Sequence, residues 1–183
     1  MKQIPRTGEF AYLLGALYGD GTSYKNKANQ AYVVTIDQKK KDWLKGHVKP
    51  LVEKLGFRPT FYSFMTGDYK KWRLTMYSKS LFETFRAMKK DVLLYVESLG
   101  RSEFLQFVAG LFDTEGSITD RINIYNKNKE LLDLIVLRLS EINISAKVYR
   151  YGKVHGIYIY RKAEVQKFFD HVPFKGKTKT PSG

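Results

Sequence analysis

Two stretches of this chain end an apolar helical pattern with an acidic residue followed by glycine. The first, Tyr12-Leu-Leu-Gly-Ala-Leu-Tyr-Gly-Asp-Gly21, ends with Asp20; the second, Phe107-Val-Ala-Gly-Leu-Phe-Asp-Thr-Glu-Gly116, ends with Glu115. A carboxylate at the C-terminal end of a helix opposes the helix dipole, so a purely structural helix would carry a cation there. Because near-repeats tend to pack side by side, we expect the two carboxylates to meet and to bind divalent metal ions.

A structural explanation exists for the first stretch alone. Gly19-Asp20-Gly21 is also typical of a helix C-cap or a hairpin turn, in which glycine supplies a left-handed backbone. The second copy keeps the acid and the final glycine but replaces the preceding pair with Thr114-Glu115. Turn chemistry does not explain that combination. We therefore interpret the two acids as a functional pair.

The repeat extends beyond the two stretches and predicts the fold. Segment 34–41 aligns with 122–129 at an offset of 88, whereas the two acids are offset by 95. The first half therefore has a longer loop between acid and strand, within residues 22–31. Each half reads as helix, two strands, helix, two strands, helix, or αββαββα. We predict an α+β fold with pseudo-twofold symmetry, divided into halves 1–98 and 99–183 by a linker near 95–101.

The helices carry local signals for their start and their packing. Thr7 and Ser102 are each followed by an acid in the next turn, which predicts that they are the N-caps of the two repeated helices. Gly15 and Gly19 are four residues apart in the first helix, and Gly110 follows Ala109 in the second. Small residues in this arrangement predict close approach of the two helix backbones at the interface between the halves.

Alternation along the strands predicts which face of each sheet is buried. Ile122 and Ile124 point one way, whereas Arg121, Asn123 and Tyr125 point the other, which is the pattern of a half-buried antiparallel sheet. The offset transfers this pattern to the first half, and the later strands repeat it. Each half therefore contributes one four-stranded antiparallel sheet with an apolar and a polar face.

The charge of the chain points to a polyanionic partner. The 183 residues carry a formal net charge of +14 and a sequence pI of about 9.7. Both halves are basic, with net charges of +9 over residues 1–100 and +5 over residues 101–183. Each half is thus suited to hold part of one nucleic acid.

The outward strand positions and adjacent loops carry side chains that read base edges or hold phosphates. We expect DNA contacts from Lys25, Lys27, Gln30, Tyr32, Val33, Thr35, Asp37, Lys39, Lys71, Arg73, Thr75, Arg121, Asn123, Tyr125, Lys127, Lys147, Tyr149, Arg150, Tyr151, Lys153, His155 and Tyr158. Arg73 in particular can donate two hydrogen bonds to a guanine edge, whereas Lys175 and Lys179 lie in a glycine-containing tail suited to phosphates.

Several classes of protein are excluded by composition. The chain has no cysteine, and His47, His155 and His171 lack metal-ligand spacing. The amino terminus has no apolar core of a signal peptide, and segment 10–18 is too short to span a bilayer. We expect an intracellular, cytoplasmic protein with neither a membrane nor a small-molecule substrate, associated with the nucleoid if the source is prokaryotic.

The two stretches resemble the paired motifs of the LAGLIDADG homing endonucleases. They read Leu13-Leu-Gly-Ala-Leu-Tyr-Gly-Asp-Gly21 and Val108-Ala-Gly-Leu-Phe-Asp-Thr-Glu-Gly116, with the acid at the eighth place of both. The resemblance covers nearly the whole chain and is strongest to compact single-chain members encoded in archaeal introns. It implies two saddle-shaped sheets over a DNA duplex, with the motif helices packed at the interface.

The resemblance also implies the active-site residues. Asp20 with the Gly19 carbonyl, and Glu115 with the Thr114 carbonyl, would hold two or three Mg²⁺ ions, for which Mn²⁺ or Ca²⁺ can substitute. The polar residues that order the water network would be Gln38 and Asn126. Lys177 matches a family lysine that approaches the scissile phosphate, whereas a solvated basic tail is its alternative explanation. The first half's linker has no evident counterpart, because Arg101 is its nearest cation.

The leading functional prediction is a magnesium-dependent, site-specific double-strand DNA endonuclease that acts as a monomer. The first alternative is an RNA maturase that holds an intron RNA for splicing on the same scaffold. A non-catalytic DNA-binding regulator is the second. Retention of both acids argues against the regulator but does not exclude the maturase.

Overall fold

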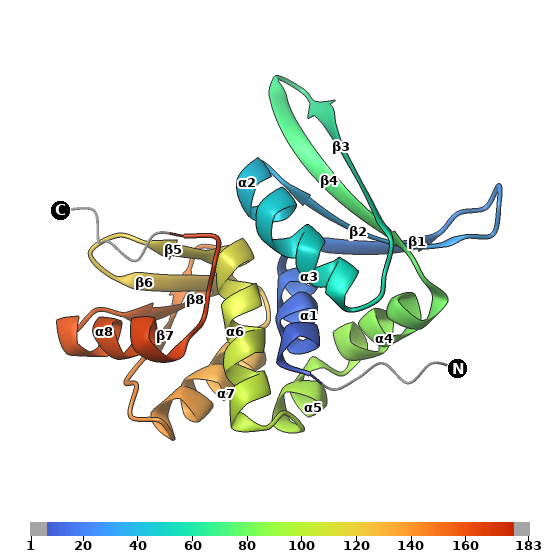
Figure 1. Cartoon of the computed structure of the whole chain (residues 1–183). Coiled ribbons are helices and arrows are strands. Elements are labelled where there is room, and N and C mark those ends of the chain that lie inside the picture. Colours follow the sequence, from blue (N-terminus) through green and yellow to red (C-terminus); the bar gives the residue numbers. More distant parts are fainter. Residues whose placement is uncertain (1–6, 178–183) are drawn as a thin grey trace.

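The computed structural model describes residues 7–177 and places two similar halves side by side (Figure 1). The first half runs α1 (Gly8–Asp20), β1 (Gly21–Lys25), β2 (Tyr32–Gln38), α2 (Lys41–Trp43), a π-helical turn (Leu44–Val48), α3 (Lys49–Lys54), β3 (Pro59–Thr66), β4 (Tyr69–Tyr77), α4 (Lys79–Lys90) and α5 (Val92–Glu97). The second half runs α6 (Arg101–Glu115), β5 (Gly116–Ile118), β6 (Ile122–Asn126), α7 (Lys129–Ser140), β7 (Lys147–Tyr151), β8 (Val154–Ile159) and α8 (Lys162–His171). The predicted α+β fold is therefore confirmed.

Each half contributes one antiparallel four-stranded sheet, and the two sheets have the same topology. Their strand orders are β1-β2-β4-β3 and β5-β6-β8-β7. The residue that follows each acid pairs with an isoleucine of the next strand, Gly21 with Ile36 and Gly116 with Ile124. These isoleucines then pair with Leu74 and Ile157. Positions that the sequence offsets align therefore occupy equivalent places in the two sheets.

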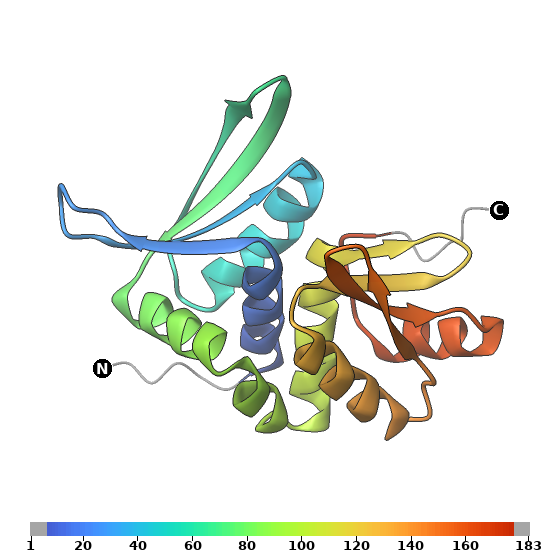
Figure 2. The ribbon, with the colours of Figure 1, turned by 180° about the vertical axis from the view of Figure 1, so that it is seen from behind.

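Helices α1 and α6 run side by side at the centre of the molecule in both views (Figure 2). Their backbones touch where glycine removes the side chain. A Cβ on Gly15 would lie 2.9 Å from the carbonyl carbon of Phe107, and a Cβ on Gly110 would lie 2.8 Å from the amide nitrogen of Ala16. Such contacts are shorter than real Cβ atoms adopt, so the predicted close approach of the helices is confirmed.

The ends of α1 and α6 show which local signals decide a helix boundary. Thr7 is the N-cap of α1 and accepts a hydrogen bond from the Phe10 amide at 3.3 Å. The prediction for Ser102 was wrong, because Gly100 occupies the N-cap position and α6 begins at Arg101. The short helix α5 ends only four residues earlier, so the chain enters α6 in an extended conformation at Gly100, and Ser102 already lies in the first helical turn.

Gly21 and Gly116, the glycines after the two acids, adopt extended rather than left-handed backbone, with φ of −83° and −91°. A Cβ on Gly21 would lie 2.7 Å from the Leu17 Cα, and one on Gly116 would lie 2.6 Å from the Phe112 carbonyl oxygen. The structure therefore excludes a left-handed glycine cap and assigns these glycines to close packing at the helix-to-strand junction.

The apolar faces of both sheets pack with α1 and α6 into one core. Val34, Ile36, Ile122 and Ile124 belong to it, as the alternation predicted. The longer first-half loop is partly strand, because β1 has five residues and β5 only three. Within residues 7–177, no helix is long and apolar enough to cross a membrane.

Candidate active site

The two predicted acids lie at adjacent helix ends. Asp20 is the last residue of α1 and Glu115 the last residue of α6, and both are half-buried. A Cβ on Gly19 would lie 2.9 Å from the Thr114 Cβ and 3.0 Å from the Glu115 Cγ, so the last turns of the helices are in contact. The structure thus brings together the last turns of α1 and α6, which carry the two acids, Gly19 and Thr114. Carbonyl groups in a last helical turn have no donor within the helix and can bind a cation.

Burial disfavours the charged state of both carboxylates, and the charge of Asp20 also disfavours that of Glu115. Burial raises the pKa of Asp20, whereas Lys71, the Gln38 hydrogen bond and Lys177 oppose that rise. Burial also raises the pKa of Glu115, and the nearby charge of Asp20 raises it further. Two neighbouring acids held in this state have a strong electrostatic reason to bind divalent cations.

The two polar residues predicted beside the acids behave differently. Gln38 donates from Nε2 to Oδ2 of Asp20. The amide oxygen of Asn126 instead accepts a hydrogen bond from the Asn128 backbone amide at 2.9 Å, next to the start of α7. The sequence repeat placed them at equivalent strand positions, but in the structure only Gln38 is hydrogen-bonded to its acid.

Lys177 reaches the junction between the halves. Its Nζ donates to the Asp113 carbonyl oxygen at 3.0 Å and lies 5.4 Å from the centre of the Phe112 ring. Burial and the charge of Lys40 lower the pKa of Lys177 to about 8. Lys177 is also close enough to lower the pKa of both Asp20 and Glu115. This placement argues against a freely solvated lysine.

Sequence reasoning missed a second cation near the acids. Lys71 of β4 is the strongest influence that lowers the pKa of Asp20. From the sequence, Lys71 is assigned to the DNA contacts, and no counterpart of Lys177 is found in the first half's linker, where Arg101 is the nearest cation. The signal that sequence reasoning missed is the length of β4. This long strand passes near Asp20, although it is distant from Asp20 in the sequence.

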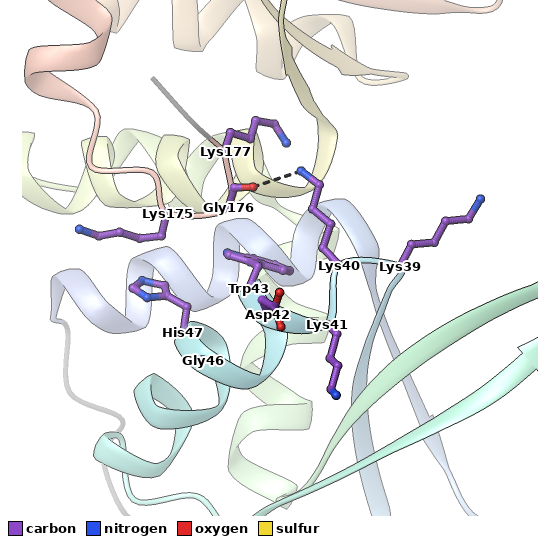
Figure 3. Close-up of a pocket in the computed structure, with 10 residues that line it drawn as sticks. All are labelled: Lys39, Lys40, Lys41, Asp42, Trp43, Gly46, His47, Lys175, Gly176 and Lys177. Carbon is purple, nitrogen blue, oxygen red and sulfur yellow. Dashed lines mark hydrogen bonds between the residues drawn. The ribbon is translucent and has the colours of Figure 1, made fainter. Parts of the chain in front are cut away.

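A basic cleft of about 750 Å³ opens beside these residues (Figure 3). Lys39, Lys40, Lys41, Asp42, Trp43, Gly46, His47, Lys175, Gly176 and Lys177 line it. Lys39 lies 3.9 Å from the centre of the Tyr69 ring, and Lys40 donates to the Gly176 carbonyl oxygen at 3.1 Å. Lys127, the repeat partner of Lys39, is exposed after β6. Lys179 lies outside the described residues.

On the polar face of the first sheet, Arg73 is already paired. It donates from Nε to Asp37 Oδ1 at 2.7 Å and from Nη2 to Asp37 Oδ2 at 2.6 Å, and its guanidinium lies 4.6 Å from the Phe64 ring centre. The hydrogen bond to Asp37 raises the pKa of Arg73, and a hydrogen bond with Tyr62 raises it further. Bidentate donation from Nε and Nη2 leaves three further N–H groups, two on Nη1 and one on Nη2. The Nη1–Nη2 edge can therefore still present two donors while the pair with Asp37 is kept.

Four residues predicted to face outward are nearly fully covered, and this expectation of exposure was wrong. Val33 and Thr35 are 1% exposed, Thr75 is 3% exposed and Asn123 is 4% exposed. They lie in central strands, where each is flanked by the side chains of two neighbouring strands. Thr35 shares a 2.7 Å hydrogen bond with Thr22, and Asn123 donates to Ser117 at 3.1 Å. Base contact by these four would require their neighbours to move.

The polar face of the second sheet carries a cluster of tyrosines. Tyr125 lies 5.8 Å from Tyr151 and 6.4 Å from Tyr158, and Tyr149 lies 5.2 Å from Tyr158, measured between ring centroids. Arg121 is paired with Asp120 at 3.0 Å. The first sheet thus offers an ion pair to a ligand, whereas the second offers aromatic rings.

The other residues predicted to contact DNA differ in how far they are exposed to solvent. Lys25, Lys27, Gln30, Lys147, Arg150 and Lys153 are exposed, as DNA contacts must be. Tyr32, also predicted as a DNA contact, lies instead on the helix-facing side of its sheet, with its ring centroid 5.1 Å from that of Phe82. Residues two apart in a strand face the same side of the sheet, so Tyr32 faces the same side as the buried Val34. His155 is half-buried, with its Nδ1 covered and unpartnered.

Duplicated αββαββα halves, with paired acids where the central helices meet, define a single-chain protein built from two motif-bearing units. A family model described as a LAGLIDADG-like domain matches residues 103–173. The homing endonuclease I-DmoI of Desulfurococcus mucosus is 32% identical over 161 residues, covering 84% of this chain and 80% of that protein.

Solved structures agree with this relationship across both halves. A crystal structure of I-DmoI in complex with DNA and Mn matches with a TM-score of 0.72 and 28% identity, covering 90% of this chain and 96% of that one. A complex with DNA and Ca matches with a TM-score of 0.74 and 26% identity, covering 95% and 94%. This chain belongs to the LAGLIDADG homing endonuclease family.

Proposed function

We propose that this chain is a site-specific endonuclease that hydrolyses both strands of duplex DNA with divalent metal ions. The observation that carries the proposal is the meeting of Asp20 and Glu115 at the ends of the paired helices, beside two polar sheet faces. A solved relative with the same fold binds DNA together with metal ions. The whole molecule, with halves 1–98 and 99–183, would act as a monomer because one chain supplies both acids.

The donor set fits a magnesium site that is completed by DNA. Asp20 with the Gly19 carbonyl, and Glu115 with the Thr114 carbonyl, supply oxygen ligands, which Mg²⁺ prefers. Residues 7–177 contain no group of three or more His, Cys, Asp or Glu side chains that could hold a metal alone. Phosphate oxygens and waters would fill the remaining positions. When bound, two or three such ions would activate water and neutralise the leaving oxygen, and Mn²⁺ or Ca²⁺ could occupy the same ligands.

The protein side chains around the acids have separate roles in this proposal. Gln38 fixes the orientation of the Asp20 carboxylate through its hydrogen bond. Lys177 supplies a cation to the charge that develops on the phosphate, and Lys71 does the same from the first sheet. Because Asn126 does not bond its acid as Gln38 does, the two strands would be cut at unequal rates.

The sheets would hold DNA by two kinds of contact. Exposed lysines and arginines at the sheet edges would bind phosphates, whereas the Arg73–Asp37 pair and the tyrosine cluster lie where base edges would be read. Paired strands of a sheet fit the major groove of duplex DNA.

Arg73→Ala is expected to relax sequence preference at one or two base pairs, at a cost of roughly 1–3 kcal/mol for the preferred site. Lys27→Ala, in the exposed connection between β1 and β2, should instead weaken all sequences alike and reduce the log-log salt slope by about one. Equilibrium binding to a panel of single-base target variants, at several salt concentrations, measures both. Uniform weakening by Arg73→Ala would show that this strand does not read bases.

The proposal is tested by comparing DNA with RNA. The protein is incubated with intronless insertion-site DNA and Mg²⁺, in parallel with filter binding to the precursor RNA. Double-strand cleavage at one site is the expected result. Tight binding of the RNA without DNA cleavage would favour the maturase instead.

A further inference from the structure

The segment that follows α8 crosses from the second half to the first. Val172 and Phe174 are buried, and the Phe174 ring centroid lies 4.9 Å from that of Phe112 in α6. Beyond this anchor, Lys175, Gly176 and Lys177 pass above Trp43 and His47 of the first half (Figure 3). The chain between Phe174 and Lys177 therefore determines where the Lys177 ammonium group can lie.

A buried carboxylate that has no place among the proposed metal ligands binds this segment. Asp113 is 2% exposed and lies in the last turn of α6. Its Oδ2 accepts hydrogen bonds from the Lys175 amide at 2.7 Å and the Tyr12 hydroxyl at 2.6 Å. Its Oδ1 accepts from the Gly176 amide at 2.6 Å. Charge-assisted bonds of this kind are about twice as strong as neutral ones.

The first half completes the arrangement. The Trp43 indole donates to the Tyr12 hydroxyl at 2.9 Å, which turns that hydroxyl toward Asp113. Lys40 donates to the Gly176 carbonyl oxygen at 3.1 Å. A side chain at Gly176 would be crowded, because a Cβ there would lie 3.0 Å from both Asp113 Oδ1 and Trp43 Cδ1. Residues of both halves thus hold the same backbone segment.

We call the hydrogen bonds from the Lys175 and Gly176 amides to Asp113 the clamp. The equivalent positions of the first half do not repeat it. At an offset of 95, Tyr18 stands where Asp113 does, and its hydroxyl accepts from Asn128 at 3.4 Å. Phe107, which cannot donate a hydrogen bond, stands where Tyr12 does. The buried carboxylate and its donors therefore serve the single segment that carries Lys177.

We propose that Asp113 is a positioning residue for DNA cleavage: its carboxylate clamps the backbone of Lys175 and Gly176 across the junction of the halves and so holds Lys177 beside Asp20 and Glu115. The inference rests on the proposed function. It assigns to Asp113 the role of orienting Lys177 and no direct contact with DNA or metal.

The first test measures the clamp without reference to activity. In the full chain, Asp113→Asn replaces one carboxylate oxygen with an NH₂ group, which cannot accept a hydrogen bond from a backbone amide. Hydrogen exchange of the Lys175 and Gly176 backbone amides should therefore accelerate by at least about tenfold. Asp133→Asn, an exposed carboxylate on α7 paired with Lys129, is the charge-matched control and should leave both amides protected. Unchanged exchange at 175 and 176 in Asp113→Asn would overturn the proposal.

The second test asks whether Asp113 acts through Lys177. Asp113→Asn should slow cleavage by about 100-fold at saturating DNA, because small displacements of catalytic groups have effects of that size. DNA affinity should change little. In a Lys177→Met background the same substitution should have almost no further effect. Equal losses in both backgrounds would show that Asp113 merely supports the fold, and would overturn the positioning role.

A third variant covers the case in which Asp113→Asn does not fold. Gly176→Val leaves Asp113 intact but places methyl groups against its carboxylate and Trp43. It should release the segment, slow cleavage and again be non-additive with Lys177→Met. Wild-type rates with Gly176→Val would contradict the clamp. If the wild-type chain itself cuts no DNA, the proposed function fails, whereas the exchange measurement still decides whether the clamp exists.

Discussion

Replacing Asp20 with Asn and Glu115 with Gln in one chain is expected to abolish cleavage of both DNA strands and to leave DNA binding largely intact. Each acid would hold the metal ions for one strand, and an amide lacks the negative charge with which a carboxylate binds Mg²⁺. Either single variant should lose cleavage or produce mainly nicked DNA. Gel analysis of supercoiled, nicked and linear products distinguishes these cases. Full double-strand cutting by the double variant would contradict the assignment of Asp20 and Glu115 as metal ligands.

The same double variant is expected to melt at a higher temperature than the wild type when both are metal-free at neutral pH. Because burial raises the pKa of both acids, the folded protein binds these protons more tightly than the unfolded chain does. Ionisation therefore costs stability. The cost is absent below the ordinary pKa values of 3.8 and 4.5 and complete above the raised ones. The advantage of the variant should thus shrink as the pH falls into the acidic range.

Asp120→Asn is the control for this melting experiment. The hydrogen bond from Arg121 lowers the pKa of Asp120, which is the opposite direction. Neutralising Asp120 should therefore give no rise in melting temperature in a chelator.

Added divalent cations should stabilise the wild type but not the double variant, because binding to the folded state alone raises stability. If the double variant melts no higher than the wild type in chelator, ionisation of the two buried acids does not cost stability.

Gly15→Leu is expected to have the largest effect on the fold, with a loss of about 3 kcal/mol or more in the free energy of unfolding. Its Cβ alone would meet the Phe107 backbone, with 2.9 Å to the carbonyl carbon and 3.1 Å to the Leu111 amide. Backbone atoms cannot rotate away as a side chain can, so α1 and α6 must separate. Separation would also move Asp20 away from Glu115 and remove cleavage.

Gly46→Ala is the matched control for a glycine within a helical segment. A Cβ at Gly46 has nothing within 4 Å, and the residue lies in the π-helical turn before α3. Alanine there should be neutral or stabilising by up to about 1 kcal/mol. Chemical unfolding of both variants measures the difference. Equal stability of Gly15→Leu and wild type would mean that the two helices do not meet as described.

The sequence was most informative where a pattern occurred twice. The offsets of 95 and 88 between the halves matched the two acids and the strands that follow them, because each position had a counterpart against which it could be checked. Gly15 and Gly110 were predicted as contact points for a physical reason, since glycine in a helix costs stability unless space demands it.

What the sequence could not show depends on neighbours that are distant along the chain. Thr35 and Thr75 have the alternation of an exposed face, but both are nearly fully buried because they lie in central strands and pair with each other there. Asp113 interacts with Tyr12 and Gly176, which are 101 and 63 residues away, and its repeat partner is a tyrosine. No internal comparison could reveal it. The pairing of Arg73 with Asp37 likewise follows only from strand register.

Selective cleavage of a randomised duplex library measures the proposed function most directly. The wild type and the Asp20→Asn, Glu115→Gln double variant are incubated in parallel with the library and Mg²⁺, and the cut ends are sequenced. We expect the wild type to enrich one extended target cut on both strands at fixed positions, and the double variant to release no cut ends while still retaining that target in a binding assay. A wild type that cuts no sequence, or cut ends that are the same with the double variant, would contradict a site-specific metal-dependent endonuclease.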